Sequence, residues 1–380
     1  MHSEQRARAA RRLAQDGIEH ALFASPLSVR WLTGLDVPGG SAENPALLWY
    51  EQGEFTLLVE NSFAAQAVAF GTQKGCKVRD YLGYTIQQPI DKAGRLARLL
   101  AEVAEAGLED TDVIGIETQS LSLNLWWAVR RLLPGGYDLT PIDGWLEPLR
   151  AVKTAEEIAT IREGFRLTDI GHIAGRAAVQ AGAQSGAREI DVWTAVQSAV
   201  EQAAGKRMEL GNDCIVGHRP TNNIGGPPGD IVIRPNDSFI LDLSVIHNGY
   251  WTDSCATYYA GEPTAQQVTL HNFVEEALAY AISLVKPGAV AKEIDQKVRD
   301  FMAKGGYKVY PHHTGHGIGL TGHEAARIVP YNEEVIQPGM VIMLEPGIYF
   351  PGVTSVRLED GMLVTETGAE VLSGHDKSLP

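Results

Sequence analysis

The sequence predicts an α/β layered domain over residues 1–148, followed by an α+β domain over residues 149–380. The length of 380 residues is enough for two or three domains. Short apolar runs alternate with helical stretches in the first part, which is typical of an α/β domain. The second part begins with two long helical stretches and then becomes rich in strands. These observations together give the predicted fold class.

Composition limits the classes of partner. The chain is 44% hydrophobic and 21% charged, which is ordinary for a globular protein, and its formal net charge is −15. Such acidity argues against binding nucleic acid through its phosphates. The three cysteines show no CxxC spacing, so neither a disulfide framework nor a thiolate zinc site is predicted. The start lacks the apolar core of a signal peptide, and no apolar run would span a membrane. We therefore expect a cytoplasmic protein without nucleic-acid or membrane partners.

In the first domain, the arginine-rich start predicts a surface helix. Four short apolar runs, residues 20–25, 45–50, 54–60 and 112–117, predict buried strands. Residues 54–60 are expected to pair with the run before them. Residues 91–107 predict a helix that a glycine closes.

The second domain begins after Pro148. Thr154 and Glu157 have capping-box spacing, so a long helix is expected to start there. Further helices are predicted over residues 189–205, 266–285 and 291–306. The strand-like runs are "DIVIR", "SFILDLSVI", "YWTDSCATYYAG", "MVIMLEPGIYF" and "TSVRLEDGMLVT".

Two of these runs carry acids where apolar residues are expected. Asn248-Gly249 is a strong signal for a two-residue hairpin turn, so residue 247 should face residue 250. Asp242 and Asp253 then become diagonal neighbours on one face. Two buried carboxylates so close repel each other, and a shared cation would relieve the repulsion. The alternative is that one of them is exposed at a sheet edge.

Further candidate ligands follow along the chain. Glu345 and Glu359 also lie in apolar runs, and residues 312–327 hold four histidines and four glycines. Four carboxylates and one imidazole suit hard divalent ions such as Mn²⁺, and two such ions match the charge of four carboxylates. The alternatives are a loop of incidental polarity around the histidines and a structural ion pair between Arg357 and Glu359.

The order of these candidate ligands resembles the pita-bread metallopeptidases. That family includes methionine aminopeptidase, Xaa-Pro aminopeptidase and Xaa-Pro dipeptidase (prolidase). The matching stretches are "LDLSVIHNGYWTD", "GHGIGLTGHE", "LEPGIY" and "RLED". "VRWLTGL" and "ALLWYEQGEFTLLVE" resemble the creatinase/prolidase amino-terminal domain, and "LRAVKTAEEI" resembles the junction. The resemblance implies a creatinase/prolidase-like amino-terminal domain and a pita-bread catalytic domain.

The resemblance also implies a site with two divalent metal ions, for which Mn²⁺ is expected and Co²⁺ and Zn²⁺ are the alternatives. The implied ligands are Asp242, Asp253, His316, Glu345 and Glu359. Asp253 and Glu359 would bridge the two ions. Asp242 would complete one shell, and His316 and Glu345 the other. Paired metals would deprotonate a bridging water to hydroxide.

The remaining implied roles concern the substrate. Glu345 would accept the proton of the water, and His323 would donate a hydrogen bond to the substrate carbonyl or oxyanion. His312, Arg327 and Arg357 are expected to bind substrate, and His313 to be structural. Arg327 suits the free carboxylate of a dipeptide, because its planar fork donates two parallel hydrogen bonds. The alternative is a surface arginine at the end of a loop.

Three positions depart from the pattern of the family. Gly225 stands where prolidases usually carry a histidine, seventeen residues before Asp242, and His218 is the nearest upstream imidazole. Cys255-Ala256 replaces a frequent Thr-Arg pair. Ala326 replaces the usual proline before the arginine. These departures concern substrate positioning rather than metal binding.

The function expected from the resemblance is hydrolysis of the Xaa-Pro bond of dipeptides. The first alternative is an Xaa-Pro aminopeptidase that acts on longer peptides. A metal-free creatinase-like C–N hydrolase and a non-enzymatic binding module belong to other classes, but such proteins typically lose ligands, and all five positions are filled here. The resemblance further suggests a homodimer, with the loop at residues 35–44 as a candidate lid.

Overall fold

A computed structural model describes residues 2–35, 46–71, 75–104, 108, 113–132, 138–219 and 224–380. The chain divides into two compact units, Met1–Arg150 and Ala151–Pro380, and each is described by itself. Of the candidate lid, all residues except Leu35 lie outside the described part of the chain.

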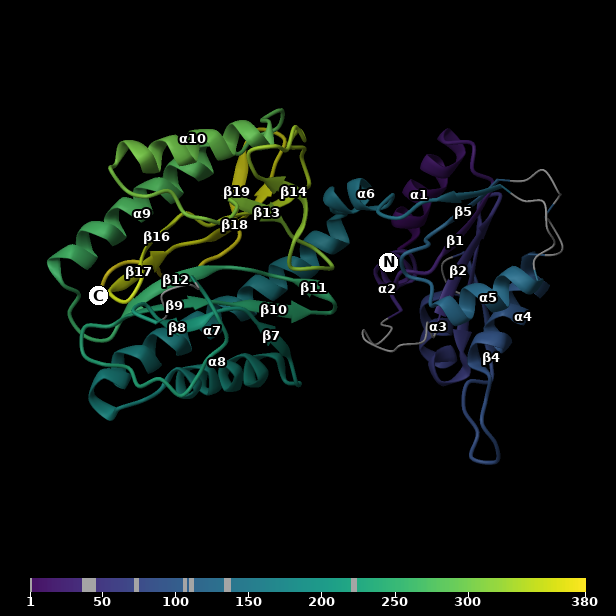
Figure 1. The fold of residues 1–380 in the computed structure, drawn as a ribbon, viewed down its shortest axis with the longest axis horizontal. Helices are drawn as coiled ribbons and strands as arrows, with labels where there is room; N and C mark the ends of the chain where they lie inside the picture. The colour runs from purple at the N-terminus through teal and green to yellow at the C-terminus, as the bar shows by residue number, and fades with distance from the viewer. Residues whose placement is uncertain are drawn as a thin grey trace. The chain divides into compact units, whose positions relative to one another are not determined.

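The first unit is built on a six-stranded mixed sheet in the order β4-β3-β2-β1-β5-β6 (Figure 1). The strands β1 and β2 and the strands β2 and β3 pair antiparallel, whereas β1–β5, β3–β4 and β5–β6 are parallel. The predicted strands in this unit are confirmed, including the pairing of residues 54–60 with the preceding strand. The bounds are β1 (His20–Phe23), β2 (Ala46–Glu51), β3 (Glu54–Glu60), β4 (Cys76–Tyr81), β5 (Val113–Ile116) and β6 (Asp138–Pro141).

Helices cover this sheet. The apolar faces of α4 and α5 pack on it, with Leu96 and Leu100 of α4 and Val129 of α5 buried against Trp49 of β2. Burial of such side chains is the main source of stability for the unit. The bounds are α1 (Ser3–Gln15), α2 (Pro26–Thr33), η1 (Asn61–Phe63), α3 (Ala64–Gly71), α4 (Lys92–Ala104), α5 (Leu123–Leu132) and α6 (Glu147–Ala151).

The second unit begins at a capped helix. The backbone N–H of Glu157 donates to Thr154 Oγ1 (3.3 Å), and the N–H of Thr154 donates to Glu157 Oε2 (2.7 Å), so the predicted capping box is confirmed. The helices of this unit are α7 (Ala155–Ser185), α8 (Glu189–Ala204), α9 (Ala265–Leu284) and α10 (Ala291–Lys304).

The strands of the second unit lie between the α7/α8 pair and the α9/α10 pair (Figure 1). They form sheets in the orders β11-β10-β7, β12-β9-β8, β14-β13-β15-β18-β19 and β16-β17. The bounds are β7 (Glu209–Gly211), β8 (Cys214–Val216), β9 (Ser238–Asp242), β10 (Ser244–His247), β11 (Tyr250–Trp251), β12 (Cys255–Tyr259), β13 (Gly315–Gly317), β14 (Glu324–Ile328), β15 (Val341–Leu344), β16 (Gly347–Phe350), β17 (Thr354–Arg357), β18 (Asp360–Val364) and β19 (Ala369–Val371).

The predicted hairpin is confirmed and positions the first two acids. His247 pairs with Tyr250, and the turn residues Asn248 and Gly249 both have positive φ, of 48° and 85°. Positive φ at both central residues matches the twist of the flanking strands. Farther along, Asp242 pairs with Cys255, so Asp253 lies diagonally opposite Asp242, as the register required.

The five strand-like runs predicted in this unit all differ in detail from the structure. "DIVIR" is not a strand, because only Val232 forms an isolated bridge, to Arg188. The other four runs are each divided between two sheets. "SFILDLSVI" is interrupted at Leu243 between β9 and β10, and the remaining three runs divide into β11 and β12, β15 and β16, and β17 and β18. An apolar run shows burial, but it does not show where a strand changes sheets.

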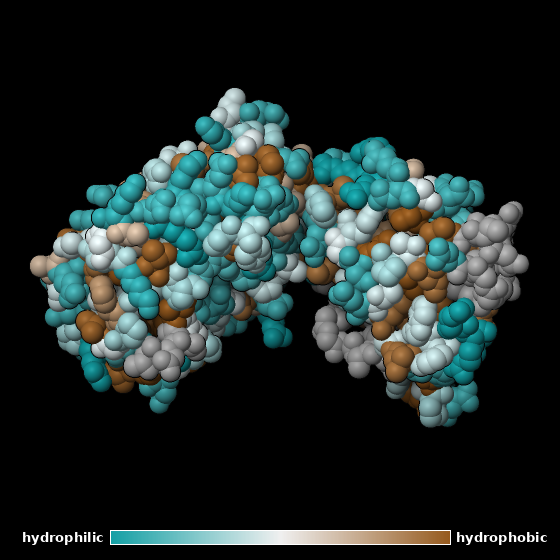
Figure 2. Space-filling view, turned by 45° about the horizontal axis from the view of Figure 1, so that its top comes forward, coloured by the Kyte–Doolittle hydropathy of each residue, from teal (hydrophilic) through white to brown (hydrophobic). Residues whose placement is uncertain are grey.

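Hydrophilic side chains cover much of the face drawn in Figure 2, and brown hydrophobic patches are scattered among them. A single exposed apolar residue is common on protein surfaces. Among the described residues, none of the helices combines the length and the apolar character needed to cross a membrane.

Candidate metal centre

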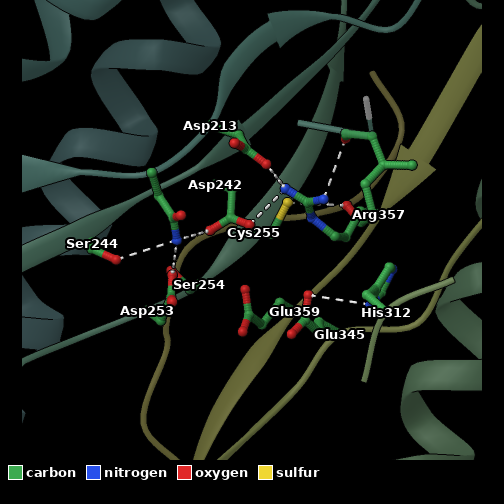
Figure 3. Close-up of polar contacts among 12 residues, drawn as sticks. Asp213, Asp242, Ser244, Asp253, Ser254, Cys255, His312, Glu345, Arg357 and Glu359 are labelled. Carbon is green, nitrogen blue, oxygen red and sulfur yellow. Dashed lines mark hydrogen bonds and ion pairs between the residues drawn. The ribbon is translucent and has the colours of Figure 1, made fainter. Parts of the chain in front are cut away.

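The candidate ligands converge on one cavity of the second unit, with a volume of about 160 Å³. Figure 3 shows the carboxylates of this set, Asp242, Asp253, Glu345 and Glu359. The cavity lies where the ends of β9, β13, β15 and β17 meet the segment before β12. Except for Ile224 and Gly225, the residues of its wall carry polar or charged side chains. The lining residues are Asn212, Asp213, Ile224, Gly225, Asp242, Asp253, His312, His313, His316, His323, Glu345, Arg357 and Glu359.

Asp242 and Asp253 face each other across one side of the cavity. Asn212 Nδ2 donates to Asp242 Oδ1 (2.8 Å) and to Asp253 Oδ1 (2.9 Å), and thereby ties the two carboxylates together. Both aspartates are buried. The alternative that one of them lies exposed at a sheet edge is therefore wrong.

His316 lies at the centre of the arrangement. Its Nδ1–H donates to the carbonyl oxygen of Gly317 (3.0 Å), which leaves the lone pair on Nε2 of the neutral ring. Nε2 lies 3.9 Å from Asp253 Oδ2, 3.9 Å from Glu345 Oε1 and 3.8 Å from Glu359 Oε1. A lone pair thus points toward oxygens that are themselves acceptors.

The glycines beside His316 lie where two strands approach closely. In the structure, a Cβ at Gly315 would lie 1.9 Å from the carbonyl oxygen of Met343, and one at Gly317 would lie 2.0 Å from that of Ala325. The glycines therefore allow β13 to fit between its neighbouring strands, which positions the His316 ring.

Glu345 follows β15 and is surrounded by imidazoles. His313 Nε2 lies 2.7 Å from Glu345 Oε1, and His312 Nδ1 lies 3.7 Å from Oε2. His312 Nε2 also contacts the Tyr349 hydroxyl at 2.9 Å. Residue His313, which we expected to be structural, thus contacts a candidate ligand directly.

Burial and mutual repulsion shift the protonation of these groups. Burial, with Asp253 next in effect, raises the pKa of Asp242 well above its ordinary value, and burial raises the pKa of Asp253 to about 6. Burial, followed by Asp253 and Asp242, also raises the pKa of Glu359. Burial lowers the pKa of His316 to about 3, so its ring is neutral at pH 7.

Glu345 differs from the other acids. Burial acts to raise its pKa, but the hydrogen bond with His313 and the nearby His312 and His316 together lower the pKa to about 2. Without metal, Glu345 is therefore ionised and in contact with the histidines. The raised pKa values of Asp242 and Glu359 favour their protonated forms instead. The repulsion is concentrated on the Asp242, Asp253 and Glu359 side of the cavity.

The residues fit divalent cations. Glu359 Oε1 is fully buried and has no hydrogen-bond partner among the residues that the structure describes. Asp253, His316 and Glu359 each offer one ligand atom, all within 4.8 Å of one another. Oxygen-rich donors with one neutral imidazole suit hard or borderline ions. A cation between them would satisfy both the orphaned oxygen and the His316 lone pair.

Arg357 lies in this cavity wall but does not pair with Glu359. Its Nη2 donates to Asp242 Oδ2 (2.7 Å) and to Asp213 (Figure 3). The alternative of a structural ion pair between Arg357 and Glu359 is thus wrong. Arg357 instead binds the outer oxygen of a candidate ligand.

The other two predicted residues lie toward the outside. The His323 ring is 4.1 Å from that of His316, centroid to centroid, yet the residue is exposed. Burial, followed by His313 and Arg327, lowers the pKa of His323. Arg327 is exposed on β14 and does not line the cavity, although its charge reaches His323. His218 lies outside the lining too, and its Nδ1 contacts Asp237 at 3.0 Å.

Sequence reasoning missed three residues of this cavity, Asn212, Asp213 and His313. The only sequence signal for the first two is a polar pair just before the apolar run "CIV". His313 was in view, but the sequence does not show that both adjacent histidines, His312 and His313, line the cavity.

Comparison with known families agrees with this geometry. Residues 159–366 match metallopeptidase family M24, and residues 5–152 match the creatinase/prolidase N-terminal domain. The first match covers more than half of the chain.

Individual relatives extend the comparison. An uncharacterized peptidase of Staphylococcus aureus is 33% identical over 269 residues, which are 69% of this chain and 73% of that protein. The prolidase from Pyrococcus furiosus superposes with a TM-score of 0.78 at 26% identity, over 97% of this chain and 99% of that one. The X-Pro aminopeptidase from Thermotoga maritima has a TM-score of 0.79 at 21% identity, over 98% of each chain, and this shows a shared fold. The predicted fold class and the predicted resemblance are both confirmed, and the chain belongs to metallopeptidase family M24.

Proposed function

We propose that this protein hydrolyses the Xaa-Pro bond of dipeptides with two divalent metal ions per chain, and that these ions are Mn²⁺. The observation that carries the proposal is the convergence of four buried carboxylates and one neutral imidazole on a single cavity, with an orphaned oxygen on Glu359. The solved structures that share the fold include a prolidase and an X-Pro aminopeptidase.

The ligand set would hold two ions. Asp253 and Glu359 would contact both, Asp242 would contact one, and His316 and Glu345 would contact the other. Bound divalent ions supply Lewis acidity, which activates water near neutral pH and polarises the scissile carbonyl. Four carboxylates balance the charge of two such ions.

The chain supplies proton transfer and orientation. Glu345 is the proposed proton acceptor, because its carboxylate lies in the cavity beside the other candidate ligands. His313 and His312 hold its carboxylate in place. His323 is neutral near pH 7, so it can donate one N–H to the oxyanion that develops on the substrate. Its place next to the His316 ring brings that donor to the edge of the ligand set.

A second candidate is an Xaa-Pro aminopeptidase that acts on longer peptides. The position of Arg327 favours this second candidate, because Arg327 is exposed and does not line the cavity. A dipeptidase must bind a free carboxylate one residue beyond the scissile bond, whereas an aminopeptidase must leave that direction open. His312 and Arg357 line the cavity in both cases and are proposed to contact substrate.

Replacing Arg327 by alanine tests the choice. If Arg327 binds the dipeptide carboxylate, kcat/KM on Xaa-Pro should fall by about 2–4 kcal/mol of transition-state stabilisation, because a charge-assisted pair is lost. The rate on Xaa-Pro-amide should change little, since that substrate lacks the charge. Arg166→Ala, at an exposed arginine of α7, is the matched control.

The comparison of substrates decides between the two candidates. The wild-type protein should prefer Xaa-Pro to Xaa-Pro-Xaa. Equal losses on acid and amide, or faster cleavage of tripeptides by the wild type, would favour the aminopeptidase.

The proposal also includes a homodimer in the cytoplasm and no need for another cofactor. Light scattering of the purified protein tests the dimer, and elemental analysis of active protein tests the metal content. Activity should disappear with a chelator and return with Mn²⁺ or Co²⁺.

A further inference from the structure

Gly225 leaves a space that another side chain fills. A Cβ on Gly225 would lie 2.0 Å from Asp213 Oδ2 and 2.4 Å from its Cγ. The carboxylate of Asp213 thus occupies the room that any side chain at position 225 would need. Both residues line the cavity of the candidate metal centre.

The Asp213 carboxylate is fixed at both oxygens. Oδ1 accepts the backbone N–H of Gly226 (2.7 Å), and Oδ2 accepts from Arg357 Nη2. The backbone N–H of Asp242 also donates to the carbonyl of Asp213 (2.8 Å). A short side chain held in this way cannot swing aside without losing these contacts.

Arg357 connects Asp213 to Asp242. The arginine side chain is only 4% exposed, and its Nη2 uses one hydrogen on each aspartate. Its Nη1 makes longer contacts, of 3.4 Å, with the carbonyl of Ile224 and the hydroxyl of Tyr349. A buried guanidinium needs anionic partners. If Asp213 were neutral, the whole charge of Arg357 would act on Asp242.

We propose that Asp213, seated in the space beside Gly225, is a positioning residue that shares the charge of Arg357 and so keeps Asp242 available as a metal ligand. The proposal rests on the proposed function, in which Asp242 binds one of two ions. Groups that hydrogen-bond a ligand from behind orient it and tune its donor strength. Asp213 acts through Arg357 and does not bind the ion.

A carboxylate is required at position 213. Both of its oxygens accept hydrogen bonds, whereas an asparagine amide offers one acceptor and one donor group. Asp213→Asn should therefore lose either the contact with Gly226 or the contact with Arg357, at almost unchanged volume. We expect the affinity for one of two Mn²⁺ ions to fall by about 10–100-fold, while the other ion keeps its affinity.

Gly225→Ala tests the role of Asp213 by changing the space that its carboxylate occupies. Its Cβ should displace the Asp213 carboxylate and so weaken the same Mn²⁺ site. In an Asp213→Ala background, Gly225→Ala should add no further loss, because the space is then empty. Gly211→Ala is the matched control, since a Cβ there would meet only Trp251, at 3.8 Å.

The experiment is a calorimetric titration of metal-free protein with Mn²⁺ for the wild type and these variants, with thermal unfolding of each to show that it folds. Wild-type-like binding of both ions by Asp213→Asn or by Gly225→Ala would overturn the positioning role and leave the proposed function standing. If Gly225→Ala lowered the Mn²⁺ affinity equally with and without the Asp213 carboxylate, the positioning role of Asp213 would also be overturned. Failure of the wild type to bind Mn²⁺ would instead sink the proposed function, and the positioning role with it.

Discussion

Two buried glutamates, one in each unit, differ in the hydrogen-bond partners that surround their carboxylates. Glu117 follows β5 in the first unit and is 4% exposed, and Glu359 follows β17 in the second and is 1% exposed. Glu117 Oε2 accepts the backbone N–H groups of Ala24 and Ser25, both at 2.7 Å, and its Oε1 accepts from the Ser28 hydroxyl. Glu359 Oε1 has no hydrogen-bond partner in the described part of the chain.

The neighbours explain the difference. Burial raises the pKa of both glutamates, but hydrogen bonds from Ser28, Ser25 and Ala24 oppose that shift in Glu117. For Glu359 the next contributions come from Asp253 and Asp242, which raise the pKa further. A buried acid among donors is part of the scaffold, whereas a buried acid among acids needs a proton or a cation. The second arrangement is characteristic of a functional site.

The largest expected effect comes from neutralising each glutamate in turn. Glu359→Gln should lose both metal ions and lower kcat/KM by about 10³-fold or more, because the metals supply several kcal/mol of transition-state stabilisation. Glu117→Gln should keep both ions and the rate. It should still lower the free energy of unfolding by about 1–3 kcal/mol, because an amide NH₂ would face N–H donors.

Elemental analysis, peptidase assays and urea unfolding of the two variants check this prediction. A Glu359→Gln protein that retained both ions at full rate would remove the distinction between the two glutamates. Loss of metal from Glu117→Gln would do so as well, since the hydrogen bonds of Glu117 come from Ala24, Ser25 and Ser28, none of which is a proposed ligand.

The sequence revealed the acids of the second unit better than their surroundings. The sequence was enough to predict that Asp242 and Asp253 are neighbours, because the Asn248-Gly249 turn fixes the register of the two strands. In that register Asp242 pairs with Cys255, and Asp253 lies diagonally opposite. Asn212, which joins their carboxylates, lies thirty residues before Asp242 in a segment without a periodic pattern. Contacts of that kind depend on the packing of whole sheets.

The histidine-rich segment illustrates the same limit. Its composition indicated a site, and the fold brings His316 to the centre of the cavity. Gly315 and Gly317 beside it serve the packing of β13 against β14 and β15. Sequence spacing shows which residue types are available, whereas strand neighbours decide which of them touch.

A smaller loss of activity is expected from replacing His323 than from replacing Glu359. His323 and His316 can be compared in the same way as the two glutamates. His316 is buried, and its Nε2 faces three carboxylates, whereas His323 is exposed at the edge of the same group. His323→Ala should lower kcat by about 10²–10³-fold, as expected for the loss of one oxyanion donor, with both ions retained. His316→Ala should lose metal. The ratio of bound Mn²⁺ to protein, measured beside kcat, separates the two roles, and loss of metal from His323→Ala would show that it is a ligand.

The smallest effect concerns two buried imidazoles away from the cavity, His172 and His375, which stack with ring centroids 3.6 Å apart. His172 contacts the Tyr258 hydroxyl and Ser254, and His375 Nδ1 contacts Asp169 at 3.1 Å, with Lys377 and Asp376 also acting on the pair. Burial lowers the pKa of both rings well below that of an unfolded histidine, about 6.5. The unfolded chain therefore binds protons that the folded one does not.

The sign of the pH dependence follows from these shifts. The stability associated with the pair is fully present above about pH 6.5 and is lost as the pH falls below it, by up to about 1.4 kcal/mol per pH unit for each ring. His375→Phe keeps an aromatic ring but cannot be protonated, so its free energy of unfolding should fall less steeply between pH 7 and pH 5. The difference in slope between variant and wild type, both measured with Mn²⁺ present, removes the contribution that the metal ligands make to both proteins. Equal slopes would mean that His375 takes up its proton over the same pH range in the folded and the unfolded protein, so that burial does not keep its ring neutral.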